Sequence, residues 1–252
     1  MTAQSSPTLW CLCRFSRPEL LPNVLANYDC QSYPSRRLVI VANGAAKDDA
    51  LDRRVDRSDV ILLRSRDGIV APFNVGLEWL RRHADPHDWV CWWDDDDLYC
   101  KTYLEPIASV ARAGALAASR PVVWMRSTEG ELWQSGGEGR HHGPTLASRL
   151  DATVPIPDNG RSLGEDGDWV LEMQKRGVVF AECPVDGFCW MRHEHRHACP
   201  LDTEAFRQLA AIERYYGPFD RRVVEGVERR EPTRPTRPPV DHDRLHALLA
   251  RN

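Results

Sequence analysis

Four consecutive aspartates, Asp94 to Asp97, directly follow the apolar run WVCWW at residues 89–93. An unbroken apolar run of this kind suits a parallel strand that is covered on both faces. Four adjacent carboxylates repel one another, so this strand must end where something offsets their charge. The chain is therefore expected to fold around a buried strand whose carboxyl end meets a polar site.

Strand-like and helix-like runs alternate along the first half of the chain. Strands are expected at residues 8–15, 37–44, 59–65 and 88–97, and helices at residues 16–31, 71–84 and 102–119. This alternation predicts an α/β fold with an open, mainly parallel sheet and helices on both of its faces. Ligands of such sheets bind beyond the carboxyl ends of the strands, where Arg14, Phe15 and Asn43 would join the aspartates.

The second half of the chain has a different texture. A hairpin is expected around Glu129-Gly130, and residues 134–164 are rich in Gly, Pro, Ser and Asn, which is typical of a substrate lid. A short helix with acids in its first turn is expected at 164–177, and a terminal helix at 201–217. The chain is divided accordingly into one domain at 1–200 with halves at 8–120 and 121–200, a C-terminal helix at 201–230, and a Pro/Arg-rich linker and tail at 231–252.

Charge and composition exclude several classes of protein. The net charge of −4 gives no overall basic field for nucleic acid. We find no signal peptide at the N-terminus and no window near the roughly 18 uninterrupted apolar residues of a membrane span. The eight cysteines have no paired CxxC spacing for zinc, so we interpret them as buried thiols of a reducing compartment. A cytoplasmic protein is therefore expected.

A divalent cation would explain the crowded aspartates. On an extended segment alternate residues face the same way, so Asp94 and Asp96 would point together while Asp95 and Asp97 point away. Carboxylate oxygens that leave other positions open suit Mg²⁺ or Mn²⁺ carrying a substrate phosphate. The alternative is a solvated acidic loop, or a cap for a helix that begins near Leu98.

Four segments, CRFSRPELLPNVLANYDCQSYPSRRLVIVANG, FNVGLEW, WWDDDDLYCKTYL and GEDGDWVLEMQKRG, occur in this order in the chain. Together they resemble the nucleotide-sugar glycosyltransferases of the GT-A fold, in the inverting family 2 group. The third segment looks like the DXD strand of that family, and the fourth like the Glu-Asp segment that holds the catalytic base. The resemblance covers about residues 8–200 and implies a GT-A (Rossmann-like) sheet, to which we expect a C-terminal helical extension.

The resemblance also implies roles for individual residues. Sugar would pass from a nucleoside diphosphate sugar to an acceptor hydroxyl, with Mn²⁺ or Mg²⁺ as cofactor and inversion at the sugar. Asp96 would be the main metal ligand, and Asp94 would contact the metal or the ribose. Asp166 is the first choice for the general base, followed by Glu165 and then by Asp168. The residues expected around the nucleotide are Arg14, Phe15, Asn43, Asn74, Asp94, Asp95 and Arg192.

Two further predictions concern the donor. Asn43 offers both a donor and an acceptor to a base edge, which favours a UDP-sugar, with guanine and thymine as the alternatives. His193, His195 and His197 alternate and would share one face of a strand. The resemblance implies that His193 or His195 completes the metal shell, the alternatives being a contact to the pyrophosphate or surface histidines.

The acceptor side is less constrained. Trp92, Trp93, Trp124 and Trp133 are expected near it, where indole faces suit sugar rings, although core packing explains any one of them as well. The acceptor stays open among glycans, small molecules, proteins and modified nucleic-acid bases, and the oligomeric state is not fixed by the sequence.

Other functions compete with sugar transfer. A sugar nucleotidyltransferase usually begins with a glycine-rich phosphate loop, which CRFSRPEL lacks. A metal-dependent nucleotide-sugar hydrolase could use the same Asp and His clusters, and hydrolysis without an acceptor would identify it. A non-catalytic module, in which the acids cap helices, would bind no nucleotide in a metal-dependent way.

Overall fold

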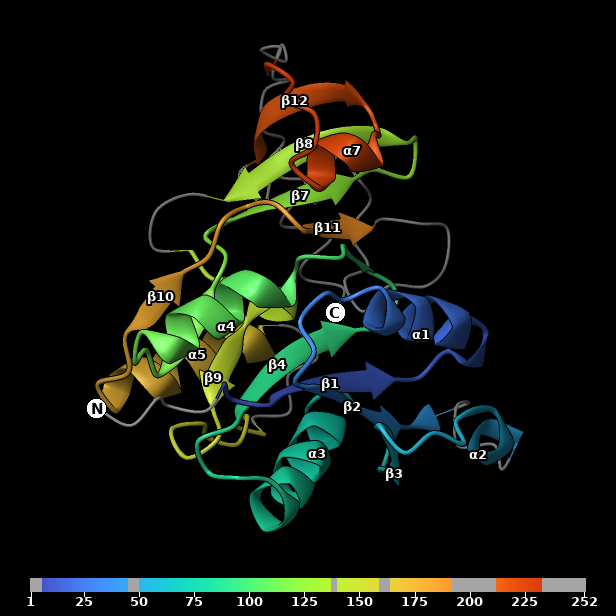
Figure 1. Cartoon of the computed structure of the whole chain (residues 1–252), viewed down its shortest axis with the longest axis vertical. Helices are drawn as coiled ribbons and strands as arrows, with labels where there is room; N and C mark the ends of the chain where they lie inside the picture. The colour runs from blue at the N-terminus through green and yellow to red at the C-terminus, as the bar shows by residue number, and fades with distance from the viewer. Residues whose placement is uncertain (1–5, 45–49, 137–139, 159–163, 192–211, 233–252) are drawn as a thin grey trace, which may run out of the picture.

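The computed structural model describes residues 6–44, 50–136, 140–158, 164–191 and 212–232, which form two β-sheets with helices packed on them (Figure 1). The larger sheet has seven strands in the order β10-β6-β9-β4-β1-β2-β3. These strands are β1 (Leu9–Phe15), β2 (Arg36–Ala42), β3 (Val60–Arg64), β4 (Trp89–Asp94), β6 (Ala117–Ser119), β9 (Ala147–Arg149) and β10 (Phe180–Glu182). All neighbouring pairs are parallel except those made by β9, so the expected α/β fold with a mainly parallel sheet is confirmed.

Helices cover both faces of the seven-stranded sheet. They are α1 (Leu21–Asp29), α2 (Ala50–Arg54), α3 (Val70–His83), α4 (Leu104–Arg112) and α5 (Glu165–Lys175). Because successive side chains of a strand point to opposite faces, Cys11 and Cys13 of β1 pack with α1 and α4, whereas Trp10 and Leu12 pack with α3 and α5. Gly76 lets α3 approach the sheet closely, since Leu12 fills the space that a side chain would need.

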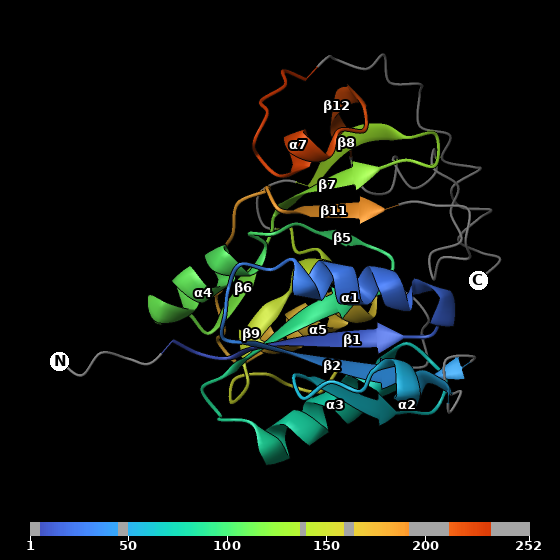
Figure 2. The same ribbon diagram turned by 45° about the vertical axis from the view of Figure 1, so that its right-hand side comes forward.

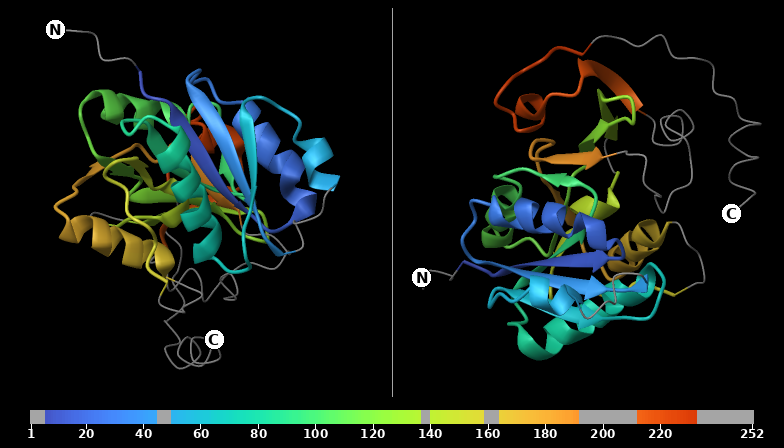
Figure 3. Two further views of the ribbon diagram at one scale, coloured as in Figure 1. Left: turned by 90° about the horizontal axis from the view of Figure 1, so that it is seen from below. Right: turned by 90° about the vertical axis from the view of Figure 1, so that its right-hand side faces the viewer.

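The smaller sheet has five strands in the order β12-β8-β7-β11-β5. They are β5 (Leu98–Tyr99), β7 (Val122–Arg126), β8 (Glu131–Gly136), β11 (Phe188–Met191) and β12 (Ile212–Pro218). Figures 2 and 3 show α1 between the two sheets and α3 on the outer side of the larger one. The two expected halves of the domain interleave, because β5 joins the smaller sheet while β9 and β10 join the larger one.

The prediction of a terminal helix over 201–217 is wrong in the part that the structure describes. Residues Ile212–Pro218 form β12, which pairs with β8 in antiparallel fashion, and of the described residues that follow, up to 232, only Arg221–Val224 (α7) form an α-helix. Tyr216 explains the strand: its ring meets Trp124 edge-on at 4.7 Å and its hydroxyl donates to Gln134 at 2.8 Å. Pairing and burial across the sheet therefore override the local helix propensity.

Two other boundaries also differ from the prediction. The helix expected over 102–119 ends at Arg112, because Gly114 at φ 90° lets the chain turn and residues 117–119 join the sheet as β6. The stretch at 134–164, expected to be a lid, contains β9 and the 3₁₀ turn Gly143–Thr145, and its residues 142–148 are buried. This part of the stretch is a packed layer rather than a cover.

The tryptophans are mostly core residues. Trp92, Trp93, Trp124 and Trp133 are all buried, so they do not present open indole faces to an acceptor. Seven of the cysteines lie in the described residues and are free thiols, as expected, and all of them but Cys30 are buried. None of the helices within the described ranges has the length and apolar character needed to cross a bilayer.

Candidate active site

The four aspartates form a turn between the two sheets. β4 ends at Asp94, residues 95–97 turn, and β5 begins at Leu98. Because the segment turns instead of continuing as a strand, the predicted alternation is only half right. Asp95 does point away, but Asp97 joins Asp94 and Asp96, and ligand oxygens of these three carboxylates all lie within 4.8 Å of one another.

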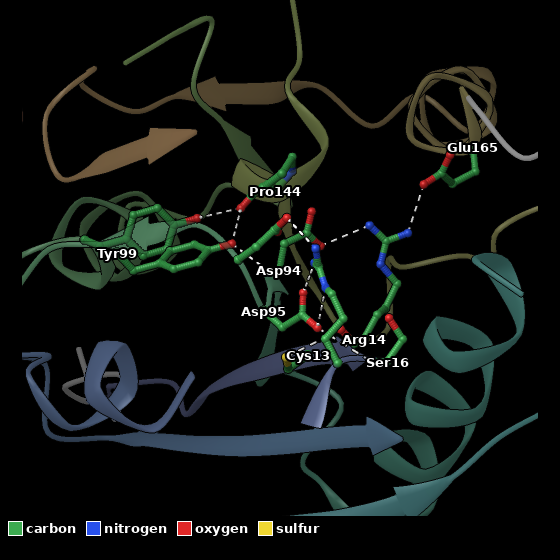
Figure 4. Close-up of polar contacts among 11 residues, drawn as sticks. Cys13, Arg14, Ser16, Asp94, Asp95, Tyr99, Pro144 and Glu165 are labelled. Atoms are coloured by element: carbon green, nitrogen blue, oxygen red, sulfur yellow. Dashed lines mark hydrogen bonds and ion pairs between the residues drawn. The ribbon is translucent and has the colours of Figure 1, made fainter. Parts of the chain in front are cut away.

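Two arginines on neighbouring elements meet the acidic turn. Arg14 of β1 is in register with Asp94 of β4 and donates to its Oδ1 at 3.0 Å. Its other terminal nitrogen donates to Oε1 of Glu165, the first residue of α5, at 2.9 Å (Figure 4). Arg17 pairs with Asp95 and, at 2.9 Å, with Asp96. Two guanidinium groups thus pair with four carboxylates, and the nearby Asp97 adds a fifth acid to the cluster.

Asp97 is the aspartate whose surroundings best suit a bound cation. Its side chain is 1% exposed, and its Oδ1 accepts from the backbone N–H of Met191 at 3.0 Å. Its Oδ2 has no hydrogen-bond partner among the described residues. Burial, together with repulsion from Asp96 and Asp94, raises the pKa of Asp97 well above its usual range. Three converging carboxylates with one unpartnered buried oxygen fit a hard divalent cation such as Mg²⁺ or Mn²⁺.

Asp95 should make the stability of the metal-free protein depend on pH. Burial raises its pKa from 3.8 to about 6, against the opposing effect of Arg17. Burial also lowers the pKa of Arg17, but attraction to Asp96 and Asp95 outweighs this effect, so Arg17 stays charged and Asp95 is the group that titrates. A raised carboxyl pKa stabilises the fold below about pH 4, and this contribution is lost as the pH rises through 6.

We therefore expect the free energy of unfolding of the metal-free protein to lose about 2 kcal/mol from this residue between pH 4 and 7. Denaturant unfolding in EDTA across this range, for the wild type and Asp95→Asn, measures it. The substitution removes the titrating group, so the difference between the two curves should change with pH. Parallel curves would show that Asp95 does not titrate in this window.

Amide side chains of α1 fix the backbone of the acidic turn. Asn23 donates to the carbonyls of Asp95 and Asp97, and Asn27 donates to that of Asp97 at 2.7 Å. Gln31 donates to the carbonyls of Tyr99 and Cys100. Asn23 and Asn27 stand four residues apart and share one face of α1, whereas Gln31 lies two residues beyond the end of that helix at Asp29. Sequence reasoning missed them, although this spacing of polar residues on a helix that is otherwise packed against the sheet was a usable signal.

The first turn of α5 holds the three acids that are candidates for the base. Glu165 is engaged by Arg14, whereas Asp166 accepts a hydrogen bond from the N–H of Gly167 at 2.9 Å. The carboxylate of Asp166 lies against Gly143, where a Cβ would come within 2.8 Å of its Oδ2. The absence of a side chain at Gly143 therefore makes room for Asp166. Asp168, the third candidate, lies in the same turn, two residues beyond Asp166.

Three residues predicted near the nucleotide make contacts within the fold. Phe15 is fully buried in the core, so its side chain is not available to a nucleobase. The amide of Asn74 is satisfied on both sides by the backbone of Ile156, at 2.9 and 2.8 Å. Asn43 does lie at the carboxyl end of β2, but it is mostly buried and its Nδ2 donates to the carbonyl of Gly68. Arg192, His193 and His195 lie outside the described residues.

Comparisons with known proteins support the fold. No protein-family model matches the chain, and no curated protein matches its sequence. Among solved structures, the S. aureus TarS fragment 1–349 is similar at 14% identity, a TM-score of 0.51 and 81% of this chain. The same fragment with UDP-GlcNAc gives 16% identity, a TM-score of 0.50 and 81% of this chain, and with UDP it gives 14%, 0.50 and 73%.

TarS is a GT-A-type glycosyltransferase, so the similarity shows that this chain has the GT-A fold. The match spans 60–65% of the TarS fragment, which is less than two thirds of its length. At this level of identity the comparison establishes the fold alone, so the function has to be argued from the residues of this chain.

Proposed function

We propose that this protein is a metal-dependent glycosyltransferase that moves a sugar from a nucleoside diphosphate sugar to an acceptor hydroxyl. One observation carries the proposal: three carboxylates converge at the carboxyl end of β4, and Asp97 leaves a buried oxygen unpartnered among the described residues. A GT-A sheet places this end of its strands at the ligand-binding edge. The TarS fragment was crystallised with UDP and with UDP-GlcNAc, which supports a uridine nucleotide as the donor.

Asp94, Asp96 and Asp97 would hold the cation. A divalent ion bound there supplies charge neutralisation to a diphosphate leaving group. The chain contributes the rest of the arrangement: the amides of α1 fix the turn, and Arg17 keeps Asp95 directed away from the cation. His193 or His195 stays our candidate to complete the ligand set, and Arg192 our candidate for the diphosphate.

Asp166 is our proposed general base. It stands at the N-terminal end of α5 and makes no ion pair with Arg14, in contrast to Glu165. An acid that is not neutralised by a guanidinium can accept the proton of an acceptor hydroxyl as the hydroxyl attacks the sugar. A single base acting opposite the leaving group implies direct displacement and inversion.

A thermal-shift panel tests the donor and the cation together. We expect UDP with Mn²⁺ to raise the Tm, and UDP in EDTA to have little effect, because the diphosphate binds through the cation. At a ligand concentration 100 times the Kd, the stabilisation is about 2.7 kcal/mol. GDP and TDP with Mn²⁺ serve as matched controls for the base. Equal shifts with and without Mn²⁺ would contradict the proposal, and release of free sugar from UDP-sugar without an acceptor would favour a hydrolase.

A further inference from the structure

We propose that Arg14 is a positioning residue that competes with the divalent cation for Asp94. The ion pair between Glu165 and Arg14 weakens this competition, because it draws the guanidinium away from Asp94. The inference rests on the proposed metal site and deepens it. It assigns to Glu165 a role in metal binding through Arg14, instead of the role of a second general base. It also connects the acidic turn to α5, the helix that carries Asp166.

The geometry of one side chain is the basis for this inference. Arg14 uses its two terminal nitrogens on two different carboxylates, at 3.0 Å on Asp94 and at 2.9 Å on Glu165. Figure 4 shows its guanidinium between these two acids, which come from β4 and α5. The guanidinium also lies 5.5 Å from the centre of the buried Trp92 ring, which restricts its position. All three charged side chains are mostly buried, with 13–22% of their surface exposed.

Competition follows from the charges. Asp94 is one of the three residues whose ligand oxygens converge, and its Oδ1 already accepts from Arg14. A cation that coordinates Asp94 must displace this contact or share the carboxylate with a positive charge about 3 Å away. At a partly buried site such a repulsion is large enough to change a metal affinity by about an order of magnitude.

Glu165 is a second ion-pair partner for Arg14. When a cation neutralises Asp94, the attraction between Asp94 and Arg14 weakens, while the attraction between Glu165 and Arg14 is unchanged. The guanidinium would then bear mainly on Glu165, and the first turn of α5 would be fixed more firmly. Metal binding would thereby also fix the position of Asp166, the next residue along α5.

Mn²⁺ binding without nucleotide tests this inference on the full chain. The Kd for MnCl₂ is measured by calorimetry for the wild type, Arg14→Met, Glu165→Gln and the double variant. Arg14→Met should tighten Mn²⁺ binding about tenfold, because it removes the competing charge. Glu165→Gln should weaken it about threefold, because Arg14 then turns to Asp94. In the Arg14→Met background the effect of Glu165→Gln should shrink to less than half, which a double-mutant cycle detects.

Turnover separates this role from a merely structural one. With saturating Mn²⁺ and donor, Arg14→Met should lower kcat about tenfold although it binds the metal more tightly, because Glu165 loses its partner. Substitution of a residue that only supports the fold would lower both the affinity for Mn²⁺ and kcat. Arg14→Lys keeps a charge but lacks the two-pronged donor, so its Kd for Mn²⁺ should fall between those of the wild type and Arg14→Met. It also serves as the test if Arg14→Met does not fold.

The outcomes distinguish this inference from the proposed function. If the wild type binds Mn²⁺ and Arg14→Met does not bind it more tightly, or if Glu165→Gln has the same effect in both backgrounds, the role of Arg14 is refuted and the transferase proposal stands. If neither protein binds Mn²⁺, both are refuted. If the double-mutant cycle gives the expected coupling in Mn²⁺ binding but the protein transfers sugar from no nucleotide-sugar donor, only the proposed function is refuted.

Discussion

Replacing Asp166 with Asn is expected to lower the rate of sugar transfer by 10²- to 10⁴-fold, the usual contribution of a general base. The amide has nearly the shape of the carboxylate, so it should keep the contact with Gly143 and the hydrogen bond from Gly167. It cannot accept the proton of an acceptor hydroxyl. The Kd values for Mn²⁺ and for UDP should therefore stay within a factor of two, while kcat collapses.

Glu172→Gln is the matched control for Asp166→Asn. Glu172 lies on the same helix and forms ion pairs with Lys175 and Arg176 at the protein surface. Its substitution should leave transfer and donor binding unchanged. Steady-state kinetics with a UDP-sugar and calorimetry with UDP and Mn²⁺ give both quantities. Transfer that survives in Asp166→Asn, or that is lost in Asp168→Asn instead, would contradict the assignment of the base.

Replacing Asp97 with Asn should stabilise the metal-free protein and abolish its response to Mn²⁺. At neutral pH the wild-type fold must either bury a negative charge on Asp97 or bind a proton there, and both cost free energy because its pKa is raised. Asn is neutral, keeps the oxygen that accepts from Met191, and turns its NH₂ towards Asp94 and Asp96. We expect a gain of about 1–3 kcal/mol in EDTA at pH 8.

The gain from Asp97→Asn should shrink as the pH falls. A group with a raised pKa is protonated in the wild type at low pH, so the substitution then removes no charge. Transfer should drop at least 10²-fold, because the cation loses a ligand. Asp52→Asn, at an exposed ion pair on α2, should change neither the Tm in EDTA nor the shift with Mn²⁺. An Asp97→Asn variant that is still stabilised by Mn²⁺ would remove this residue from the metal site.

The sequence predicted those parts of the molecule that depend on local pattern. The strands β1 to β4 follow from apolar runs, and the N-terminal acids of α5 from the position of Glu165 and Asp166. Once the parallel order is known, the register of β1 and β4 also places Arg14 beside Asp94. These features need only the period of the side chains and the direction of the strands.

The parts that were missed depend on contacts between distant segments. The turn at residues 95–97 is held by α1, whose amides lie about 70 residues earlier in the chain. Arg14 reaches Glu165 across 151 positions of sequence. The strand β12 exists because β8 offers an edge and Trp124 an aromatic face, neither of which the periodicity of residues 212–218 reveals. Tertiary partners decide such cases.

The acidic turn is also one of the short covalent links between the two sheets, as are the two residues between β6 and β7. Only residues 95–97 separate β4 of the larger sheet from β5 of the smaller one. An insertion here would displace the candidate ligand residues and change how the two sheets are placed. The hairpin at residues 127–130, which joins β7 to β8, could lengthen without displacing the ligand residues. Natural relatives of this chain should therefore vary in length at that hairpin and keep the spacing between β4 and β5 constant.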